Sequence, residues 1–444
     1  MPLGDVVLQV SASIGVTLYP QDGADADQLL RHADQAMYIA KQSGKNRYHL
    51  FDVDQDVAVQ TQRESMERIR LALDKHEFVL HYQPKVNMRT GSVIGAEALI
   101  RWQHPERGLL PPIVFLPLIE NSAFSVALGE WVINTALSQL DKWRAAGFSL
   151  PVSVNISAHQ LQQIEFVGRL STLLAAHPDI HPSLLQLEIL ETSALEDISR
   201  VSSIMNTCRQ IGVRFALDDF GTGYSSLIYL KRLPADVLKI DQSFIRDMLD
   251  DPSDLAIVEG VIGLAAAFRR ECIAEGVETI THGLHLLTLG CDLAQGYGIA
   301  RPMPADDFPA WAASWAPYPA WTAWRGLANS RDEITLVHAE VEHRHWINNI
   351  DAYLGGKRDT PPPMSHQECN LGMWLQTDGG TRYREHPFFS TVLSKHEQIH
   401  TLGRDILALH LNGEQDHAQN RMPELYALHD ELITMLGVLA GRAD

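Results

Sequence analysis

The stretch VRFALDDFGTGYSS (residues 213–226) joins an apolar run of strand type to two aspartates and a glycine-containing loop. Six further apolar, β-rich runs carry polar residues at or near their ends: GSVIGAEALIRW (91–102), LPVSVNIS (150–157), LLQLEILE (184–191), DVLKID (236–241), ECIAEGVE (271–278) and LAQGYGIARP (293–302). A helix-like stretch or a short loop follows each run. This alternation favours a parallel sheet covered by helices, and in barrels of this kind the chemistry lies at the carboxyl ends of the strands. We therefore expect an α/β barrel whose polar tips converge.

The polar tips supply carboxylate and amide oxygens, the ligands that hard divalent cations prefer. Six residues form this candidate metal-binding mouth: Glu97, Asn155, Glu188, Asp218, Asp219 and Glu275. Two ions about 4 Å apart need one shared carboxylate flanked by separate ligands. The aspartate pair meets this need if Asp218 bridges the ions and Asp219 binds the second. Such a pair before glycines is also a common turn or helix cap, so that alternative stays open.

Length, charge and cysteine content limit the class of protein. A chain of 444 residues exceeds what one hydrophobic core normally supports, so we expect two or three domains. The formal net charge of -19 and the pI of about 5.4 disfavour a DNA or RNA partner, which needs a basic surface. Four cysteines without a disulfide pattern indicate a reducing compartment, and we expect a cytoplasmic protein. The sequence predicts no membrane segment and no signal peptide.

Taken together, these motifs resemble the EAL-type cyclic di-GMP phosphodiesterase domain, whose eponymous triplet is here Glu97-Ala98-Leu99. The resemblance covers residues 67–308 and implies a modified TIM (β/α)8 barrel. It also implies hydrolysis of cyclic di-GMP to linear pGpG with two Mg2+ or Mn2+ ions. The family's ligands of the first ion correspond to Glu97, Asn155, Glu188 and Asp218. Asp218 and Asp219 hold the second ion, and Glu275 lies close to both.

The same resemblance implies roles for further residues. Lys239 of LKID would contact or activate the attacking water, and Glu191 would steady the DDFGTGYSS loop. Other residues of the family's site correspond to Glu278 and Gln295, and substrate-side contacts correspond to Gln83 and Arg101. An arginine in that position can donate two hydrogen bonds to a phosphate.

The chain departs from the family pattern at two apolar positions. Ile100 stands where leucine is common, and Ile299 stands where an aromatic residue is common. Both exchanges affect packing or base stacking rather than metal binding. Because every matched metal ligand keeps its type, the sequence favours a working hydrolase. The alternatives are a nonhydrolytic cyclic di-GMP receptor and a zinc-responsive signalling scaffold.

Residues 1–52 predict a short α/β segment. The motifs IGVTLYPQDG, ADQAMYIAKQ and SGKNRYHLF resemble the C-terminal part of a diguanylate cyclase (GGDEF) domain. The Gly-Gly-acidic signature and the phosphate-binding loop of that family are absent, so cyclase activity is not supported. This truncated GGDEF segment is either the product of a truncation or a structural relic. Residues 53–66 then predict a linker helix.

A composition shift separates the barrel from the C-terminal region. Residues 309–330 hold four of the nine tryptophans and three prolines, and we expect this connector to cover the barrel surface or a domain joint. From residue 331 to 444 the chain is helical in pattern and rich in histidine. His396 and His400 stand one helical turn apart, which places both imidazoles on one face.

With H-x-x-W at His343 and C-x-L-G-x-W at Cys369, the C-terminal region resembles the chemoreceptor zinc-binding (CZB) domain, an all-α helical bundle. The resemblance implies one Zn2+ ion held by His343, Cys369, His396 and His400. It leaves seven other histidines as bystanders: His338, His345, His366, His386, His410, His417 and His429. A fully ligated zinc ion is structural or sensory rather than catalytic. We expect a homodimer whose activity zinc regulates, or a zinc ion that only holds the dimer together.

Overall fold

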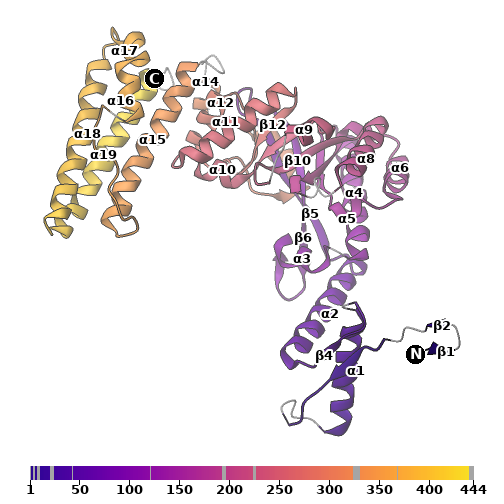
Figure 1. The fold of residues 1–444 in the computed structure, drawn as a ribbon. Helices are drawn as coiled ribbons and strands as arrows, with labels where there is room; N and C mark the ends of the chain where they lie inside the picture. The colour runs from indigo at the N-terminus through magenta and orange to yellow at the C-terminus, as the bar shows by residue number, and fades with distance from the viewer. Residues whose placement is uncertain are drawn as a thin grey trace. The chain divides into compact units, whose positions relative to one another are not determined.

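A computed structural model describes most of the chain (Figure 1). The described residues are 2–3, 6–7, 11–20, 25–42, 44–120, 122–192, 197–223, 227–323, 331–367 and 369–439. The predicted segments fall partly outside them: residues 1, 4–5, 8–10, 21–24 and 43 of the GGDEF segment, 121, 193–196 and 224–226 of the barrel, 324–330 of the connector, and 368 and 440–444 of the bundle. The chain forms two compact units, Met1–Phe78 with Trp102–Glu120, and Val79–Arg101 with Asn121–Asp444.

The first unit begins with a βαβ arrangement. Its elements are β1 (Pro2–Leu3), β2 (Val6–Val7), β3 (Ile14–Val16), α1 (Ala26–Gln42), β4 (Tyr48–Leu50) and α2 (Val53–Asp74). Strands β3 and β4 pair in parallel, and α1 packs closely on them. A Cβ atom at Gly15 would lie 1.9 Å from the carbonyl oxygen of Ala33, so this contact requires glycine. Tyr19 and Tyr48 are each 74% exposed, which leaves apolar surface of this segment uncovered within the described residues.

An aromatic cluster holds the rest of the first unit together. The remaining elements are β7 (Gly108–Leu110), the 3-10 helix η1 (Pro112–Val114) and α3 (Leu116–Ile119). The ring of Phe78 lies 5.8 Å from that of Trp102 and 5.3 Å from that of Phe115. Glu77 Oε2 accepts hydrogen bonds from Arg68 and from the Trp102 indole, at 2.7 and 2.9 Å. Glu77 thereby links the helix that carries Arg68 to the ring of Trp102.

A closed barrel of eight strands forms the centre of the second unit. Its strands are β5 (Phe78–Asn87), β6 (Val93–His104), β8 (Val152–Asn155), β9 (Leu185–Leu190), β10 (Arg214–Phe220), β11 (Val237–Ile240), β12 (Glu271–Ala274) and β13 (Leu293–Ala294). The sheet order among the described residues is β14-β5-β13-β12-β11-β10-β9-β8-β6-β7, where β14 is Met303–Pro304, and pairing of β5 with β6 closes the ring. Strand β5 runs antiparallel to β13, whereas the pairs from β6 to β13 are parallel. This confirms the predicted modified (β/α)8 barrel.

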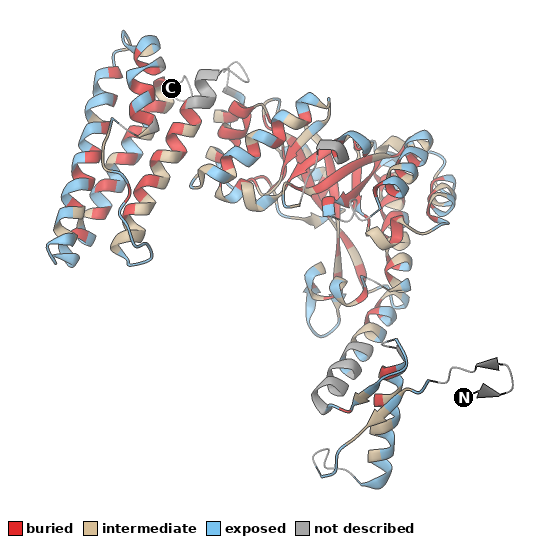
Figure 2. Ribbon diagram, viewed as in Figure 1, coloured by how far each residue is buried: buried red, intermediate tan, exposed pale blue. Residues whose placement is uncertain are grey.

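Helices follow the barrel strands and bury them on their outer face, which explains the continuous apolar runs of the sequence (Figure 2). They are α4 (Ala123–Ala145), α5 (Ala158–Leu161), α6 (Phe166–Ala175), η2 (Pro182–Leu184), α8 (Ile198–Ile211), α9 (Leu227–Arg232), α10 (Gln242–Asp247), α11 (Pro252–Ala267) and α12 (Ile280–Leu289). Short polar side chains begin several of them. Asp197, Asp251 and Thr279 each accept a hydrogen bond from a backbone N–H of the first turn.

The tryptophan-rich connector packs on the barrel. It contains α13 (Phe308–Ser314) and α14 (Pro319–Ala323), preceded by β14 (Met303–Pro304). Trp321 is fully buried, and its indole N–H donates to the carbonyl oxygen of Ile280 at 2.9 Å. A Cβ atom at Gly283 of α12 would lie 2.3 Å from the Trp321 ring, so the ring rests directly on that helix. These contacts support the interpretation that the connector's rings cover barrel surface.

The C-terminal region is an all-α bundle, as predicted. Its helices are α15 (Arg331–Leu354), α16 (Asn370–Gln376), α17 (Asp378–Tyr383), α18 (Phe389–Leu411) and α19 (Gln415–Leu439). Its core includes the fully buried Ile350, Ile399, Leu425 and Leu432. In Figure 2 the buried residues line the inner sides of the long helices. Across the described residues, no helix of the chain has the length and apolarity to span a membrane.

The burial of Trp321 predicts a large loss of stability when the indole is removed. We expect Trp321→Ala to destabilise the protein by about 3–5 kcal/mol, since it creates a cavity and leaves the Ile280 carbonyl without its donor. Trp311→Ala is the matched control, because Trp311 is only partly buried in the same connector. Denaturant unfolding measures both. Equal losses for the two variants would contradict the packing described for α14.

Candidate metal centres

Polar side chains converge at the carboxyl ends of the barrel strands. Asn155 ends β8, and its Cα partner on β9 is Glu188. Asp218 lies near the end of β10, Lys239 lies on β11, and Glu275 directly follows β12. Parallel strands bring these ends to one rim of the barrel. The convergence predicted from the sequence is therefore present.

A strand irregularity turns both aspartates of the Asp218–Asp219 pair towards this rim. Consecutive residues of a regular strand point to opposite faces. Here the pairing of β10 with β11 shifts between Leu217 and Phe220, and Asp219 adopts a left-handed backbone with φ of 52°. Because the alternation is broken at this point, adjacent aspartates can join one cluster.

The carboxylates form two triads. One triad comprises Glu97, Glu188 and Asp218, and the other comprises Asp218, Asp219 and Glu275. Within each triad, one oxygen from every carboxylate lies within 4.8 Å of the others. Asp218 belongs to both. Two divalent cations bridged by one carboxylate need this donor arrangement.

Lys239 lies at the centre of the carboxylates and is 1% exposed. Its Nζ atom is 2.6 Å from Glu188 Oε2, 2.6 Å from Glu275 Oε1 and 2.9 Å from Asp218 Oδ1. Glu97 Oε2 is farther away, at 3.5 Å. Burial alone would lower the pKa of Lys239, but these four carboxylates raise it well above its ordinary value. The ammonium group therefore offsets negative charge in the region that both triads surround.

Burial and mutual repulsion raise the pKa of three carboxyl groups in the triads. Burial, and then the charge of Glu188, raises the pKa of Glu97. Burial also raises the pKa of Glu275 well above its ordinary value, against the effect of Lys239. Burial and the neighbouring Asp218 raise the pKa of Asp219 to about 7. Close carboxylates that repel one another are stabilised by cations, so this donor set fits two divalent ions.

The pKa of Glu188 is lowered, in contrast to those of Glu97, Asp219 and Glu275. Burial alone would raise its pKa, but Lys239 and Lys85 together lower it to about 2. Glu188 is fully buried, and each of its oxygens contacts one of the two ammonium groups. Its carboxylate therefore stays ionised well below the pH at which an ordinary glutamate gains a proton.

Amide side chains complete the rim. Asn155 Nδ2 donates to Glu97 Oε1 at 2.7 Å. Gln295 Nε2 donates to Glu97 Oε2 at 2.7 Å and to Gln83 Oε1 at 2.9 Å, and Gln83 in turn donates to the Ala300 carbonyl at 3.0 Å. The buried Oε1 atom of Gln295 has no hydrogen-bond partner among the described residues, so it is an acceptor available to a ligand or water.

Glu191 anchors the start of the glycine-containing loop. Its Oε2 atom accepts a hydrogen bond of 2.9 Å from the backbone N–H of Gly221, which has a φ of 105°. A Cβ atom at Gly223 would lie 2.9 Å from Glu191 Oε1. Glycines at these positions therefore allow the loop to approach the buried carboxylate. The contacts are compatible with the steadying role that the sequence predicts for Glu191.

The two remaining predicted residues lie in different surroundings. Arg101 is on β6, four residues after Glu97 and therefore on the same strand face, and it is partly buried. Burial lowers the pKa of Arg101, although Tyr297 and Glu97 act in the opposite direction. The side chain of Glu278 is exposed, and its backbone N–H donates to His282 Nδ1 at 3.4 Å. Arg101 Nη1 donates to the carbonyl oxygen of Ile100 at 2.8 Å, and among the described contacts neither Arg101 nor Glu278 binds a carboxylate of the triads.

Sequence reasoning missed a buried polar layer around the base of Glu188. It consists of Lys85, Ser153 and Gln186, all at most 8% exposed. A signal was present, because Gln83 and Lys85, Ser153 and Asn155, and Gln186 and Glu188 are each two residues apart. Residues at that spacing share one face of a strand. Polar pairs in apolar strands thus mark the inside of the barrel.

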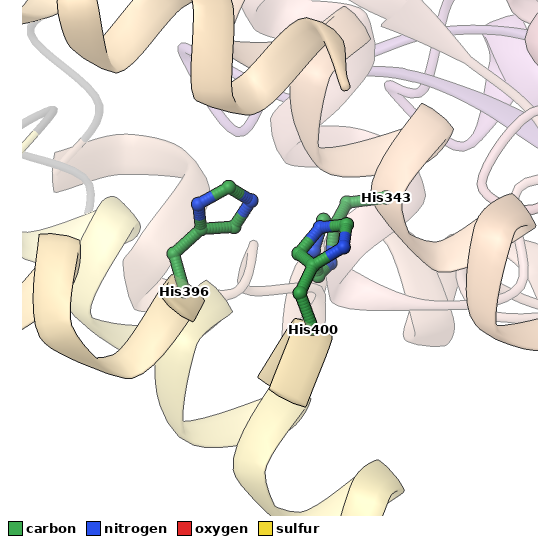
Figure 3. A group of neighbouring side chains, drawn as sticks. All are labelled: His343, His396 and His400. Atoms are coloured by element: carbon green, nitrogen blue, oxygen red, sulfur yellow. The ribbon is translucent and has the colours of Figure 1, made fainter. Parts of the chain in front are cut away.

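A second cluster lies in the helical bundle (Figure 3). His343 comes from α15, and His396 and His400 come from α18; ligand atoms of the three lie within 4.8 Å of one another. Cys369, at the N-cap of α16, places its Sγ atom 3.1 Å from His396 Nε2. The structure therefore brings all four predicted zinc ligands together.

The burial and the lowered pKa values of these imidazoles make them suitable ligands for a metal ion. His343, His396 and His400 are at most 2% exposed, and both ring nitrogens of His343 and His400 have no hydrogen-bond partner among the described residues. Burial lowers the pKa of His343 well below its ordinary value, that of His396 to about 3 and that of His400 to about 4. Neutral imidazoles with free nitrogens are zinc ligands, and a thiolate completes a tetrahedral set.

His429 of α19, expected to be a bystander, is a buried neighbour of this cluster. Its ring stacks on that of His343 at 5.3 Å with an interplanar angle of 4°. It is 2% exposed, and burial lowers its pKa to about 4. His366 also lies near, with its ring 6.3 Å from those of His396 and His400. His429 lies outside the three motifs that resemble the zinc-binding domain, so residue spacing did not reveal it.

Comparison with protein families identifies the barrel. The sequence model of the EAL domain matches residues 66–302, which is more than half of the chain. The chain belongs to the EAL domain family. The chemoreceptor zinc-binding domain model matches residues 343–407, and the diguanylate cyclase GGDEF domain model matches residues 2–47. These matches confirm the family resemblances drawn from the sequence.

Two curated proteins are similar to this chain over about two thirds of its length. The bifunctional diguanylate cyclase/cyclic di-GMP phosphodiesterase MucR of Pseudomonas aeruginosa is 42% identical over 67% of this chain and 44% of its own length. The cyclic di-GMP phosphodiesterase PdeR of Escherichia coli is 39% identical over 70% of this chain and 46% of its own length. The chain thus spans about half the length of these relatives.

Solved structures agree with the fold of the EAL domain. The phosphodiesterase domain of MucR in a c-di-GMP complex superposes with a TM-score of 0.54 at 42% identity, covering 55% of this chain and 99% of that one. The EAL enzyme Bd1971, in its cAMP and cyclic-di-GMP bound form, gives a TM-score of 0.56 at 33% identity, covering 66% of this chain and 77% of that one.

The lowered pKa values in the bundle predict acid sensitivity of the metal-free protein. Unfolding exposes His343, His396, His400 and His429, whose imidazoles then bind protons with an ordinary pKa of about 6.5. The contribution of these buried, neutral imidazoles to the free energy of unfolding should therefore be fully present above that pH. Below it, the contribution should decrease by up to about 1.4 kcal/mol per pH unit for each imidazole. Denaturant unfolding of the chelator-treated protein at pH 7.5, 6.5 and 5.5 measures the slope.

Variants on α19 supply the control for this pH dependence. His417→Ala removes an exposed histidine, whose side chain is 74% accessible, and should leave the slope unchanged. His429→Leu should reduce it, because one buried imidazole no longer titrates. Equal slopes in His429→Leu and in the unaltered protein would contradict the burial described for His429.

Proposed function

We propose that the EAL domain hydrolyses cyclic di-GMP to linear pGpG with two Mg2+ or Mn2+ ions. The observation that carries this proposal is the pair of carboxylate triads that share Asp218 around Lys239. MucR and PdeR, the relatives described above, are named as cyclic di-GMP phosphodiesterases, which supports the same substrate here. The strand ends supply hard oxygen donors, as magnesium and manganese require.

The proposed ligands divide between the two triads. Glu97, Asn155, Glu188 and Asp218 would hold one ion, and Asp218, Asp219 and Glu275 would hold the other. When bound, such ions stabilise charge on a phosphodiester and lower the pKa of a water molecule. The remaining chemistry depends on residues that position this water and the substrate.

Lys239 is the residue best placed to orient the attacking water. Its ammonium group has three donors and lies within 3.5 Å of Glu97, Glu188, Asp218 and Glu275. Cations in the triads would compete with Lys239 for these oxygens and release its donors towards a water molecule or a phosphate oxygen. Its raised pKa keeps the group positively charged, so it stabilises charge rather than acting as a base.

Other residues would hold the substrate and the loop. Arg101, on the same strand face as Glu97, would donate to a phosphate, and Gln83 lies beside Gln295 at the inner wall. Gln295 would keep Glu97 in position through its 2.7 Å hydrogen bond. We assign Glu191 to support of the glycine-containing loop, and Glu278 to a contact on the exposed side of the site.

Hydrolysis of cyclic di-GMP by the purified chain tests the proposal. With Mg2+ or Mn2+ we expect conversion to pGpG, resolved by chromatography, and no conversion with a chelator. Glu97→Gln keeps the shape of the side chain but removes its charge, and should reduce turnover by about 100-fold or more, as expected when a preorganised electrostatic group is lost.

A surface variant and a binding assay complete this experiment. Glu106→Gln removes an exposed carboxylate near the end of β6 and should keep full activity. Binding of cyclic di-GMP without turnover in the unaltered chain would exclude the hydrolase and favour the receptor. Activity that is the same in Glu97→Gln and in the unaltered chain would exclude the proposed ligand set.

We further propose that the bundle binds one Zn2+ ion and that zinc regulates the EAL domain. Support for the site comes from His343, Cys369, His396 and His400, whose nitrogens and sulfur converge from three helices. Four protein ligands would fill a tetrahedral zinc ion, so the ion would be structural or sensory. Imidazole and thiolate donors differ from the oxygen donors of the barrel, so the two sites select different metals.

Helix α15 supports a route from the zinc site to the barrel. It carries His343 and also contacts α11 and α12, the helices that flank β12. His338 Nε2 lies 2.7 Å from Glu259 Oε2 of α11. Glu340 Oε2 lies 3.6 Å from His285 Nε2 of α12, with both residues at most 4% exposed. A shift of α15 on zinc binding would therefore act on the helices next to Glu275.

A homodimer and a cytoplasmic location are part of the same proposal. The four cysteines are free, and Cys369 must stay reduced to act as a zinc ligand, which supports a reducing compartment. A dimer gives zinc a second means of regulation, through the arrangement of two EAL domains. Light scattering with and without zinc measures the oligomeric state.

Zinc titration against turnover tests the regulatory proposal. We expect the rate of cyclic di-GMP hydrolysis to change as the site fills. Cys369→Ser weakens zinc binding and should remove the response, whereas His417→Ala removes an exposed histidine and should retain it. An unchanged rate with a demonstrably filled site would leave zinc a structural role only.

A further inference from the structure

A buried ammonium group lies beneath the carboxylate triads. Lys85 Nζ is 2.5 Å from Glu188 Oε1, 2.5 Å from Ser153 Oγ and 3.5 Å from Gln186 Oε1. Ser153 in turn donates to Gln186 Oε1 at 2.7 Å. Lys85 is 6% exposed and Glu188 is fully buried. Three barrel strands, β5, β8 and β9, thus converge on one buried charge pair.

The two lysines bind opposite oxygens of one carboxylate. Lys85 lies at Glu188 Oε1, and Lys239 lies 2.6 Å from Glu188 Oε2. Oε2 shares its ammonium group with the other carboxylates, because Lys239 also contacts Asp218 and Glu275. Oε1 instead contacts Lys85, which lies against Ser153 and Gln186.

We propose that Lys85 is a positioning residue that restricts Glu188 to binding a metal ion through one oxygen, Oε2. This inference rests on the proposed function, in which Glu188 is a ligand of one of the two ions. Carboxylates otherwise bind such ions through one or both oxygens, and Mg2+ requires near-ideal octahedral geometry. Because Lys85 would hold Oε1, Glu188 would occupy one coordination position of the ion, and the other positions would be open to the neighbouring ligands and to water.

The surroundings explain why a lysine is suited to this role. An ammonium group donates three hydrogen bonds, and Glu188, Ser153 and Gln186 supply three acceptors. Loss of Lys85 would leave Glu188 Oε1 buried without a donor and free to turn towards the ion. Groups that orient metal ligands in this way typically contribute 10–100-fold to metal affinity.

Binding of Mn2+ in the absence of substrate tests the proposal. Electron paramagnetic resonance of free Mn2+ gives the affinity, and thermal unfolding reports stability separately. Lys85→Met and Lys85→Gln should each weaken binding by about 10–100-fold. Ser153→Ala is the matched control, because it removes a partner of Lys85 but keeps the contact with Glu188; its Mn2+ affinity should stay close to that of the unaltered chain.

The results separate a failure of the role proposed for Lys85 from a failure of the proposed function. If the unaltered chain binds no Mn2+, both fail. If the unaltered chain binds Mn2+ and a folded Lys85 variant binds it equally well, only the role of Lys85 is overturned. If both Lys85 variants fail to fold, a crystal structure of the Mn2+-loaded unaltered chain decides. One oxygen of Glu188 on the ion with Lys85 on the other supports the inference, and two oxygens on the ion overturn it.

Discussion

The barrel mouth depends on the charge balance around Lys239. Glu97, Glu188, Asp218 and Glu275 come from four different strands or strand ends, and each lies within 3.5 Å of one ammonium group. A carboxylate that is buried without a partner costs several kcal/mol, so none of these side chains could remain ionised alone. The closed sheet makes the arrangement possible, because its register brings the strand ends to one rim. The fold of the barrel therefore places the four carboxylates around one buried ammonium group, that of Lys239.

Much of the architecture could be predicted from the sequence, and the reasons are local. Apolar runs that end in Asn155, Glu188 or Asp218 mark strand ends, and parallel strands align those ends at one rim. Three findings could not be predicted this way. The backbone shift at Asp219, the approach of Lys85 to Glu188 and the stacking of His429 on His343 depend on contacts between segments far apart in the chain. Spacing within one segment contains no information on such contacts.

Different interactions stabilise the ligands of the two candidate metal centres. In the barrel, an ammonium group offsets repulsion between carboxylates in the described site. In the bundle, burial keeps His343, His396 and His400 neutral, and the ring nitrogens of His343 and His400 lack hydrogen-bond partners among the described residues. Oxygen donors suit magnesium or manganese, and nitrogen with sulfur suits zinc. One chain can therefore contain both sites without competition for the same ion.

Asp218 is the one carboxylate that belongs to both barrel triads. An ion in either triad would draw on the same side chain that the other triad uses, so occupancy of one position alters the free energy of filling the other. The metal concentration that half-fills two such positions would then be a property of the pair and not of either position. A variant that affects Asp218 would abolish this coupling, whereas a variant of Glu97 or Asp219 would leave one position intact.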